Sequence, residues 1–195
     1  MTASGDLLID AFDRIRDTVH RVVDGLSPDE LAVRVDEGAN SIAWLVWHLT
    51  RIQDDHIADL AGTDEVWIAQ DWTGRFELPF SRRATGYGHS PKDVAAVGGV
   101  TGEALVGYHD AVHEQTVTYL RTLEDEDYGR VVDRTWVPAV TLGVRLVSVV
   151  SGVSLHFGLC AVVLCWPTRP CSPCGAVSAR SGRPRRPGFR AACPG

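Results

Sequence analysis

The chain has 195 residues, of which 45% are hydrophobic and 23% charged, and its formal net charge is −6. This balance is typical of a globular domain and excludes a fibrous or wholly disordered chain. Six of the 19 basic residues and none of the 25 acidic ones lie in residues 166–195, so residues 1–165 carry a net charge of −12. A body this acidic repels phosphate backbones, and we therefore expect no nucleic-acid partner.

The distribution of cysteine and of charge at the N-terminus bears on the cellular compartment. All five cysteines lie in the last 36 residues, so the body of the chain is not built on disulfides. The first residues, MTASGDLLIDAFDRIRD, contain acids where a signal peptide needs a basic and then an apolar region. These observations predict a cytoplasmic protein.

The first half of the chain contains two long helical patterns. Apolar residues spaced by three and four predict a helix over about 4–24, which Gly25 ends. The sequence Ser-Pro-Asp-Glu at 27–30 is a capping box that predicts a short second helix. A second long helix is predicted from Asn40 or Ser41 to Gly62.

The connection over residues 63–100 has little periodicity, apart from a turn or two of helix that Ser90 and Pro91 can begin. A connection of this length within a domain is usually functional or partly disordered. A third long helix is predicted over about 101–123. A fourth, capped by Thr141 and running to about Cys165, is apolar nearly all round.

Four segments with apolar faces and no convincing alternating strand predict an all-α fold, a four-helix bundle over residues 1–165. Residues 146–166 lack formal charge and are long enough to span a bilayer, but the three amphipathic helices before them favour a buried bundle helix over a membrane anchor. Residues 166–195 are rich in Pro, Arg and Cys without periodicity and are predicted to be a disordered tail.

Three groups of residues have the chemistry of a metal site. His48 and His156 each lie in the middle of an apolar helix, where imidazoles from facing helices can meet at one metal. His109 and His113 lie one turn apart, a spacing that can chelate a transition metal. For each of these histidines the competing interpretation is a hydrogen-bonded core residue. Cys171 and Cys174 form a CxxC pattern, but no second zinc knuckle and no βαβ pattern accompanies it.

Several stretches resemble an actinobacterial branch of the DinB-like superfamily, to which mycothiol-dependent maleylpyruvate isomerase also belongs. They are NSIAWLVWHLTR at 40–51 with QDDH at 53–56, ATGYGH at 84–89, YHDAVH at 108–113 and VTLGVRLVSVVS at 140–151. The resemblance covers about residues 5–158. It implies an up-down four-helix bundle with a long crossover between the second and third main helices, and a divalent metal in the core.

The resemblance also implies a set of metal ligands. A histidine on the second helix matches His48, and the last residue of an acid-or-His-x-x-x-His element matches His156. The first position of that element is Gly152, which has no side chain to donate, so the resemblance implies a site one ligand short. Beyond residue 158 the similarity stops, and the ending is either a divergent tail or a coding sequence read out of frame.

The resemblance thus implies a divalent-metal-dependent enzyme, with Zn²⁺ or a similar ion, that uses a low-molecular-weight thiol such as mycothiol or bacillithiol against an electrophilic substrate. Asp55 and His113 are further candidates to orient a ligand or move a proton. The alternative is a non-catalytic helical bundle that binds a small molecule or forms a homodimer through its apolar faces, with no membrane partner in either case.

Overall fold

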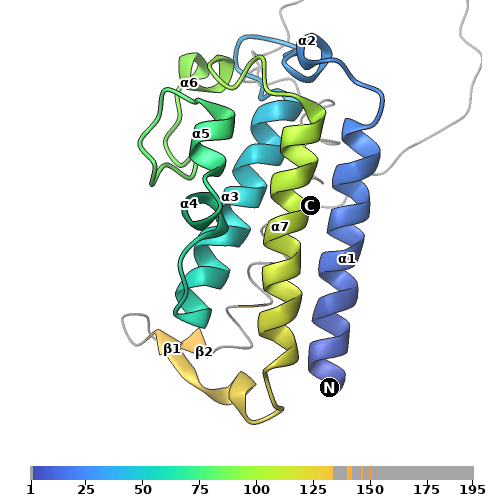
Figure 1. Ribbon diagram of the computed structural model, residues 1–195, viewed down its shortest axis with the longest axis vertical. Coiled ribbons are helices and arrows are strands. Elements are labelled where there is room, and N and C mark those ends of the chain that lie inside the picture. Colours follow the sequence, from blue (N-terminus) through green and yellow to red (C-terminus); the bar gives the residue numbers. More distant parts are fainter. Residues whose placement is uncertain (1, 134–139, 142–145, 147–149, 151–195) are drawn as a thin grey trace, which may run out of the picture.

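Three long helices lie side by side and form the frame of the protein. The computed structural model describes residues 2–133, 140–141, 146 and 150. Helix α1 spans Ala3–Val23, α3 spans Ile42–Ala61 and α7 spans Gly102–Arg121. Figure 1 shows α7 between the other two, and its principal contacts are with α1 and α3. The all-α prediction is confirmed.

The ends of the long helices lie within one or two residues of those that the sequence predicts. The side chains of Thr2, Ser41 and Thr101 accept hydrogen bonds from the first-turn amides of α1, α3 and α7. Gly62 ends α3 in the left-handed conformation, with a φ of +67°. Capping side chains satisfy amides that a first turn leaves without partners, so short polar residues set where these helices begin.

The crossover between α3 and α7 contains more helix than its lack of periodicity indicates. The short helices are α2 (Pro28–Leu31), which precedes α3, and then α4 (Val66–Ala69), α5 (Trp72–Phe76) and α6 (Pro91–Ala95) within the crossover. The predicted capping box at Ser27 is present, and the short helix that Ser90 and Pro91 were expected to begin also starts with a capping box. Helices α4 and α5 were not predicted, because four or five residues are too few to show a period of 3.6.

The crossover returns the chain to the starting end of α3, so α3 and α7 run in the same direction and α1 runs opposite to both (Figure 1). After α7 come a short 3-10 turn, Asp127–Gly129, and an antiparallel pair of strands, β1 (Val131–Asp133) and β2 (Val140–Thr141). These strands were not predicted. Each has at most three residues, too short for an alternating pattern to show.

The predicted fourth helix lies mostly outside the described residues. Leu146 and Val150, the members of that segment that the structure describes, are both helical, and Leu146 is buried in the core. The predicted tail over 166–195 also lies outside the described residues, as does most of the apolar stretch 146–166. Within the described ranges, no helix combines the length and apolar character needed to cross a membrane.

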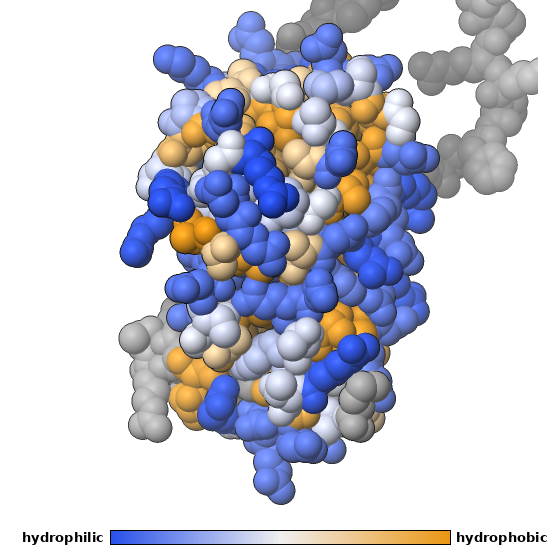
Figure 2. All heavy atoms as spheres, viewed as in Figure 1, coloured by the Kyte–Doolittle hydropathy of each residue, from blue (hydrophilic) through white to orange (hydrophobic). Residues whose placement is uncertain are grey.

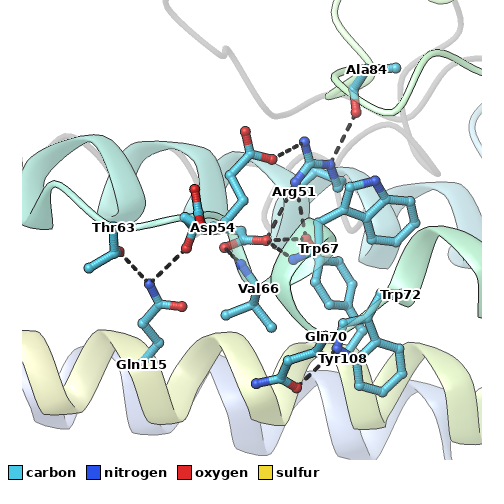
Figure 3. A network of polar contacts seen from close by, with 12 residues as sticks. Arg51, Asp54, Thr63, Val66, Trp67, Gln70, Trp72, Ala84, Tyr108 and Gln115 are labelled. Carbon is cyan, nitrogen blue, oxygen red and sulfur yellow. Dashed lines mark hydrogen bonds and ion pairs between the residues drawn. The ribbon is translucent and has the colours of Figure 1, made fainter.

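A buried ion pair lies inside this frame, on α3 (Figure 3). Arg51 and Asp54 have side chains that are 0% and 1% exposed, and Arg51 Nη1 lies 3.4 Å from Asp54 Oδ2. Arg51 Nη2 also lies 2.7 Å from Oε2 of Glu65. The Tyr108 hydroxyl on α7 donates to Asp54 at 2.8 Å. Burial raises the pKa of Asp54, and hydrogen bonds from Trp67 and Tyr108 to the charged form oppose that rise.

Asp54 also begins the next helix. Its two carboxylate oxygens accept hydrogen bonds from the backbone amides of Val66 and Trp67, each at 2.8 Å. The residue that precedes α4, Glu65, makes no side-chain capping bond of its own. The Asp54 carboxylate, which belongs to α3, therefore acts as the N-cap of α4 and fixes where the crossover begins.

Removing the Asp54 carboxylate is predicted to destabilise the protein strongly. In Asp54→Ala the Arg51 guanidinium loses a buried partner and two α4 amides lose their acceptor, so we expect the free energy of unfolding to fall by about 3–5 kcal/mol. Urea denaturation followed by circular dichroism measures this. The matched control is Asp10→Ala, which breaks an exposed pair with Arg14 and is expected to cost less than about 1 kcal/mol. Equal effects of the two variants would contradict the prediction.

Candidate functional site

His48 lies on α3 beneath the crossover and is held there by aromatic rings. Its side chain is buried. The Trp44 ring, one turn earlier on α3, stacks on it with ring centroids 4.6 Å apart. Tyr87 meets the ring edge-on at 5.6 Å. Tyr87 is itself 70% exposed, so the candidate ligand is covered by a side chain that faces solvent.

The backbone of Thr85 sets the chemical state of His48. Its carbonyl oxygen lies in hydrogen-bond contact with His48 Nδ1. A carbonyl accepts only, so Nδ1 carries the proton and donates, and Nε2 carries the lone pair in the neutral ring. Metal-binding histidines almost always have this arrangement, with the second ring nitrogen donating to a carbonyl or carboxylate. His48 is therefore prepared to coordinate through Nε2.

The residue after Thr85 must be glycine for this contact to form. Gly86 has a φ of +100°, a conformation that residues with a side chain rarely adopt. A Cβ at this position would overlap the His48 ring at Nδ1. The ATGYGH stretch thus lies directly against His48, a contact between residues 37 positions apart that no spacing in the sequence indicates.

Asp55 lies on the same face of α3 as His48, two turns further along, which is about 10 Å along the helix axis. The structure places it in a neighbouring cleft of about 470 Å³. Arg82 and Arg83 line the same cleft. The structure therefore does not bring Asp55 into contact with His48.

His109 and His113 have separate hydrogen-bond partners in two different helix interfaces. His109 Nδ1 lies 3.0 Å from the Thr50 hydroxyl, in the interface between α3 and α7. His113 Nε2 lies 2.7 Å from Asp13 Oδ1, in the interface between α7 and α1. Throughout the described residues, no group of three or more His, Cys, Asp or Glu side chains is arranged to hold a metal ion. Of the two interpretations of this pair, the structure supports hydrogen-bonded interface residues.

The fit of the described residues to a divalent metal is thus partial. They supply one imidazole, His48, with the backbone partner that a ligand needs, but they contain no group of three or more His, Cys, Asp or Glu side chains arranged around a metal position. The other positions singled out by the sequence, Gly152, His156, Cys171 and Cys174, lie outside the described residues. The sequence indicated His48. It did not indicate Thr85 and Gly86, whose backbone lies against the imidazole, or Arg51, whose side chain holds that segment in place.

A second cleft lies between α1 and α7, on another part of the surface. It has a volume of about 1020 Å³ and is lined largely by charged side chains of both signs. His20 of α1 and Asp110 of α7 join its two walls, with Nε2 and Oδ1 2.7 Å apart. In the view of Figure 2 hydrophilic side chains cover much of the surface, and apolar side chains are visible between them.

The pH dependence of stability follows from His109. Burial, together with repulsion from His113, His20 and Arg16, lowers the pKa of His109 from 6.5 to about 3. Below pH 6.5 the unfolded chain gains a proton on this residue that the folded protein does not take up until about pH 3. Stability from this group is therefore complete above pH 6.5 and is lost as the pH falls towards 3.

We predict that His109→Asn flattens this acid dependence, because asparagine does not titrate and its amide can donate to Thr50 as Nδ1 does. For the unmodified protein, His109 contributes about 2 kcal/mol of the stability lost between pH 7 and pH 5. Urea unfolding at a series of pH values measures the difference. Gln115→Asn, which changes a non-titrating side chain at a partly exposed position on α7, is the control and is expected to leave the slope unchanged. An unchanged slope in His109→Asn would contradict the assignment.

Comparison with known proteins agrees with this architecture. A solved structure described as a conserved protein from Enterococcus faecalis is similar, with a TM-score of 0.76 and 28% sequence identity over 83% of this chain and 94% of the other. None of the curated proteins matches the chain. The family model for the DinB superfamily matches residues 11–156, which include most of α1, all of α3 and α7, and the whole crossover. The chain belongs to the DinB superfamily.

Proposed function

We propose that this DinB superfamily protein binds a divalent metal ion through His48 and His156 and uses it with a low-molecular-weight thiol, such as mycothiol or bacillithiol, in a transferase or isomerase reaction. The observation that carries the proposal is the contact between His48 Nδ1 and the Thr85 carbonyl. That contact directs the lone pair to Nε2, the state in which an imidazole coordinates a metal.

The residues around His48 have roles that follow from their positions. Trp44 and the Thr85 carbonyl hold the imidazole ring in one orientation and one tautomer. A divalent ion bound here would lower the pKa of a thiol, so that thiolate is available at neutral pH to attack an electrophile. Exposed Tyr87, edge-on to His48, lies where an incoming substrate meets the site.

The two further candidates differ in what the structure supports. Asp55 lines the cleft beside the His48 face of α3, where it is placed to bind a polar part of the thiol or of its electrophilic partner. His113 is bonded to Asp13 in the interface between α1 and α7, and we assign it to that interface rather than to the metal.

The number of donors sets the expected affinity. Catalytic zinc sites have about three protein ligands and an open position. His48 and His156 are two, and Gly152 adds none. We therefore expect the protein as it stands to bind metal weakly.

The test is metal content in purified protein and its variants. We predict well under one equivalent of zinc-class metal in the unmodified chain, and higher occupancy in Gly152→Asp, because the new carboxylate lies one helical turn before His156 in the predicted fourth helix. Adding His48→Ala to Gly152→Asp should abolish that gain, whereas adding His20→Ala should not. Elemental analysis and competition with a chelator measure occupancy and affinity.

Two results would contradict the proposal in different ways. Tight binding of one equivalent by the unmodified protein would show that a donor other than Gly152 completes the site, and Asp55→Asn and His113→Asn would then identify it. Binding that survives loss of both His48 and His156 would show that the metal lies elsewhere.

A second candidate function is a non-catalytic one, in which the bundle binds a small molecule or a second copy of itself. The observation in its favour is the cleft of about 1020 Å³ between α1 and α7, which is large enough for a ligand and does not have His48 among its lining residues. Absence of metal from Gly152→Asp, together with ligand- or concentration-dependent protection of the α1 and α7 amides from hydrogen exchange, would favour this function over the first.

A further inference from the structure

One segment of the crossover is bound to α3 at three successive places. We call residues 84–89 the crossover strap. Arg51 Nε donates to the Ala84 carbonyl at 3.1 Å, and His48 Nδ1 meets the Thr85 carbonyl. At the other end of the strap, Trp44 Nε1 donates to His89 Nδ1 at 3.1 Å. The three helix residues are spaced by four and three, so they lie on one face of α3.

Arg51 is the most firmly held of these three donors. Its guanidinium is fully buried, is paired with Asp54 and Glu65, and lies over the Trp67 ring at 5.2 Å. It also donates to the Tyr108 hydroxyl at 3.3 Å. A planar guanidinium with this many partners has one orientation, so its Nε–H points in a fixed direction. Figure 3 shows it reaching from this network to Ala84.

The carbonyls bound by Arg51 and by His48 belong to consecutive residues. The Ala84 carbonyl lies in the peptide bond before Thr85, and the Thr85 carbonyl lies in the peptide bond after it. Holding the first carbonyl therefore restricts where the second can lie. On the far side of the Thr85 carbonyl, Gly86 lies so close to the ring that an added Cβ would overlap His48 Nδ1. The position of the acceptor for His48 therefore depends on the donor at Arg51.

We propose that Arg51 is a positioning residue for His48: by holding the Ala84 carbonyl it places the Thr85 carbonyl against Nδ1 and so fixes the tautomer of His48. The use of that tautomer for metal binding rests on the function proposed above, but the tautomer itself does not. It is a property of the metal-free protein and is measured without metal.

The test compares metal-free protein with Arg51→Lys. Lysine keeps the positive charge beside Asp54 and Glu65 but has no Nε–H of fixed direction to offer Ala84. We label histidine with nitrogen-15 and record long-range proton–nitrogen spectra at pH 8, with His48→Gln to assign the signal. The unmodified protein is expected to show His48 with Nδ1–H alone, and Arg51→Lys to show loss of this single state in favour of a mixture with Nε2–H.

The control is Arg75→Lys, which alters another guanidinium that lies over a tryptophan ring, that of Trp72 at 4.4 Å. It is expected to leave the His48 spectrum unchanged. A folded Arg51→Lys protein that keeps His48 wholly in the Nδ1–H state would overturn the proposal, because a merely structural role for Arg51 predicts lower stability with no change of tautomer.

Two measurements keep the proposal testable if Arg51→Lys does not fold. In the unmodified protein the Arg51 Nε–H must exchange slowly with solvent and show coupling through the hydrogen bond to the Ala84 carbonyl carbon; fast exchange without coupling overturns the proposal. Gly86→Ala puts a Cβ against the His48 ring and displaces the Thr85 carbonyl from Nδ1, while leaving the side-chain partners of Arg51, which are Asp54, Glu65 and Tyr108, unchanged. It should also produce the mixture of tautomers, and an unchanged tautomer would show that the Thr85 carbonyl does not set it.

The results of this experiment and of the metal experiment are separable. A His48 tautomer that depends on Arg51, in a protein whose Gly152→Asp variant takes up no metal, supports the positioning role and contradicts the metal site. Metal uptake by that variant, with a tautomer indifferent to Arg51→Lys, contradicts the positioning role alone.

Discussion

The buried pair of Arg51 and Asp54 is the interaction on which the rest of the structure depends. Two charges within the core are tolerated only when each finds several partners, since an unpaired buried charge costs several kcal/mol. The partners come from separate parts of the chain: the start of α4, Tyr108 of α7, and the backbone at Ala84. Satisfying two charges therefore fixes where the beginning and the middle of the crossover lie against α3.

The candidate site follows from that constraint. The crossover segment held by Arg51 continues directly to Thr85 and Gly86, which lie on the His48 ring. A helix alone leaves the tautomer of a histidine open, whereas a carbonyl held at Nδ1 selects one state. The contacts that hold the crossover on α3 thus also orient His48. A change that weakens the ion pair between Arg51 and Asp54 is therefore expected to alter the tautomer of His48 as well.

The polar side chains in the other helix interface have a different consequence. Thr50 bonds to His109, and Gln53 donates to the Thr116 hydroxyl at 2.9 Å, so α3 and α7 meet through a line of neutral polar groups as well as apolar ones. Such groups specify one register between two helices, because each donor needs its own acceptor. The cost is sensitivity to acid, since His109 cannot take up a proton where it lies.

The sequence by itself determined the all-α class, the three long helices, the cap at Ser41, the capping box at Ser27 and the short helix that begins at Ser90. These depend on periodicity and on side chains that bond to their own first turn, so neighbours in the sequence suffice to predict them. Helices α4 and α5, the strap and the partners of His48 were decided only by the tertiary structure. Asp54 caps a helix 12 residues away, and Thr85 meets a histidine 37 residues away. Contacts over such distances leave no period in the sequence, because the fold of the whole crossover determines which groups meet.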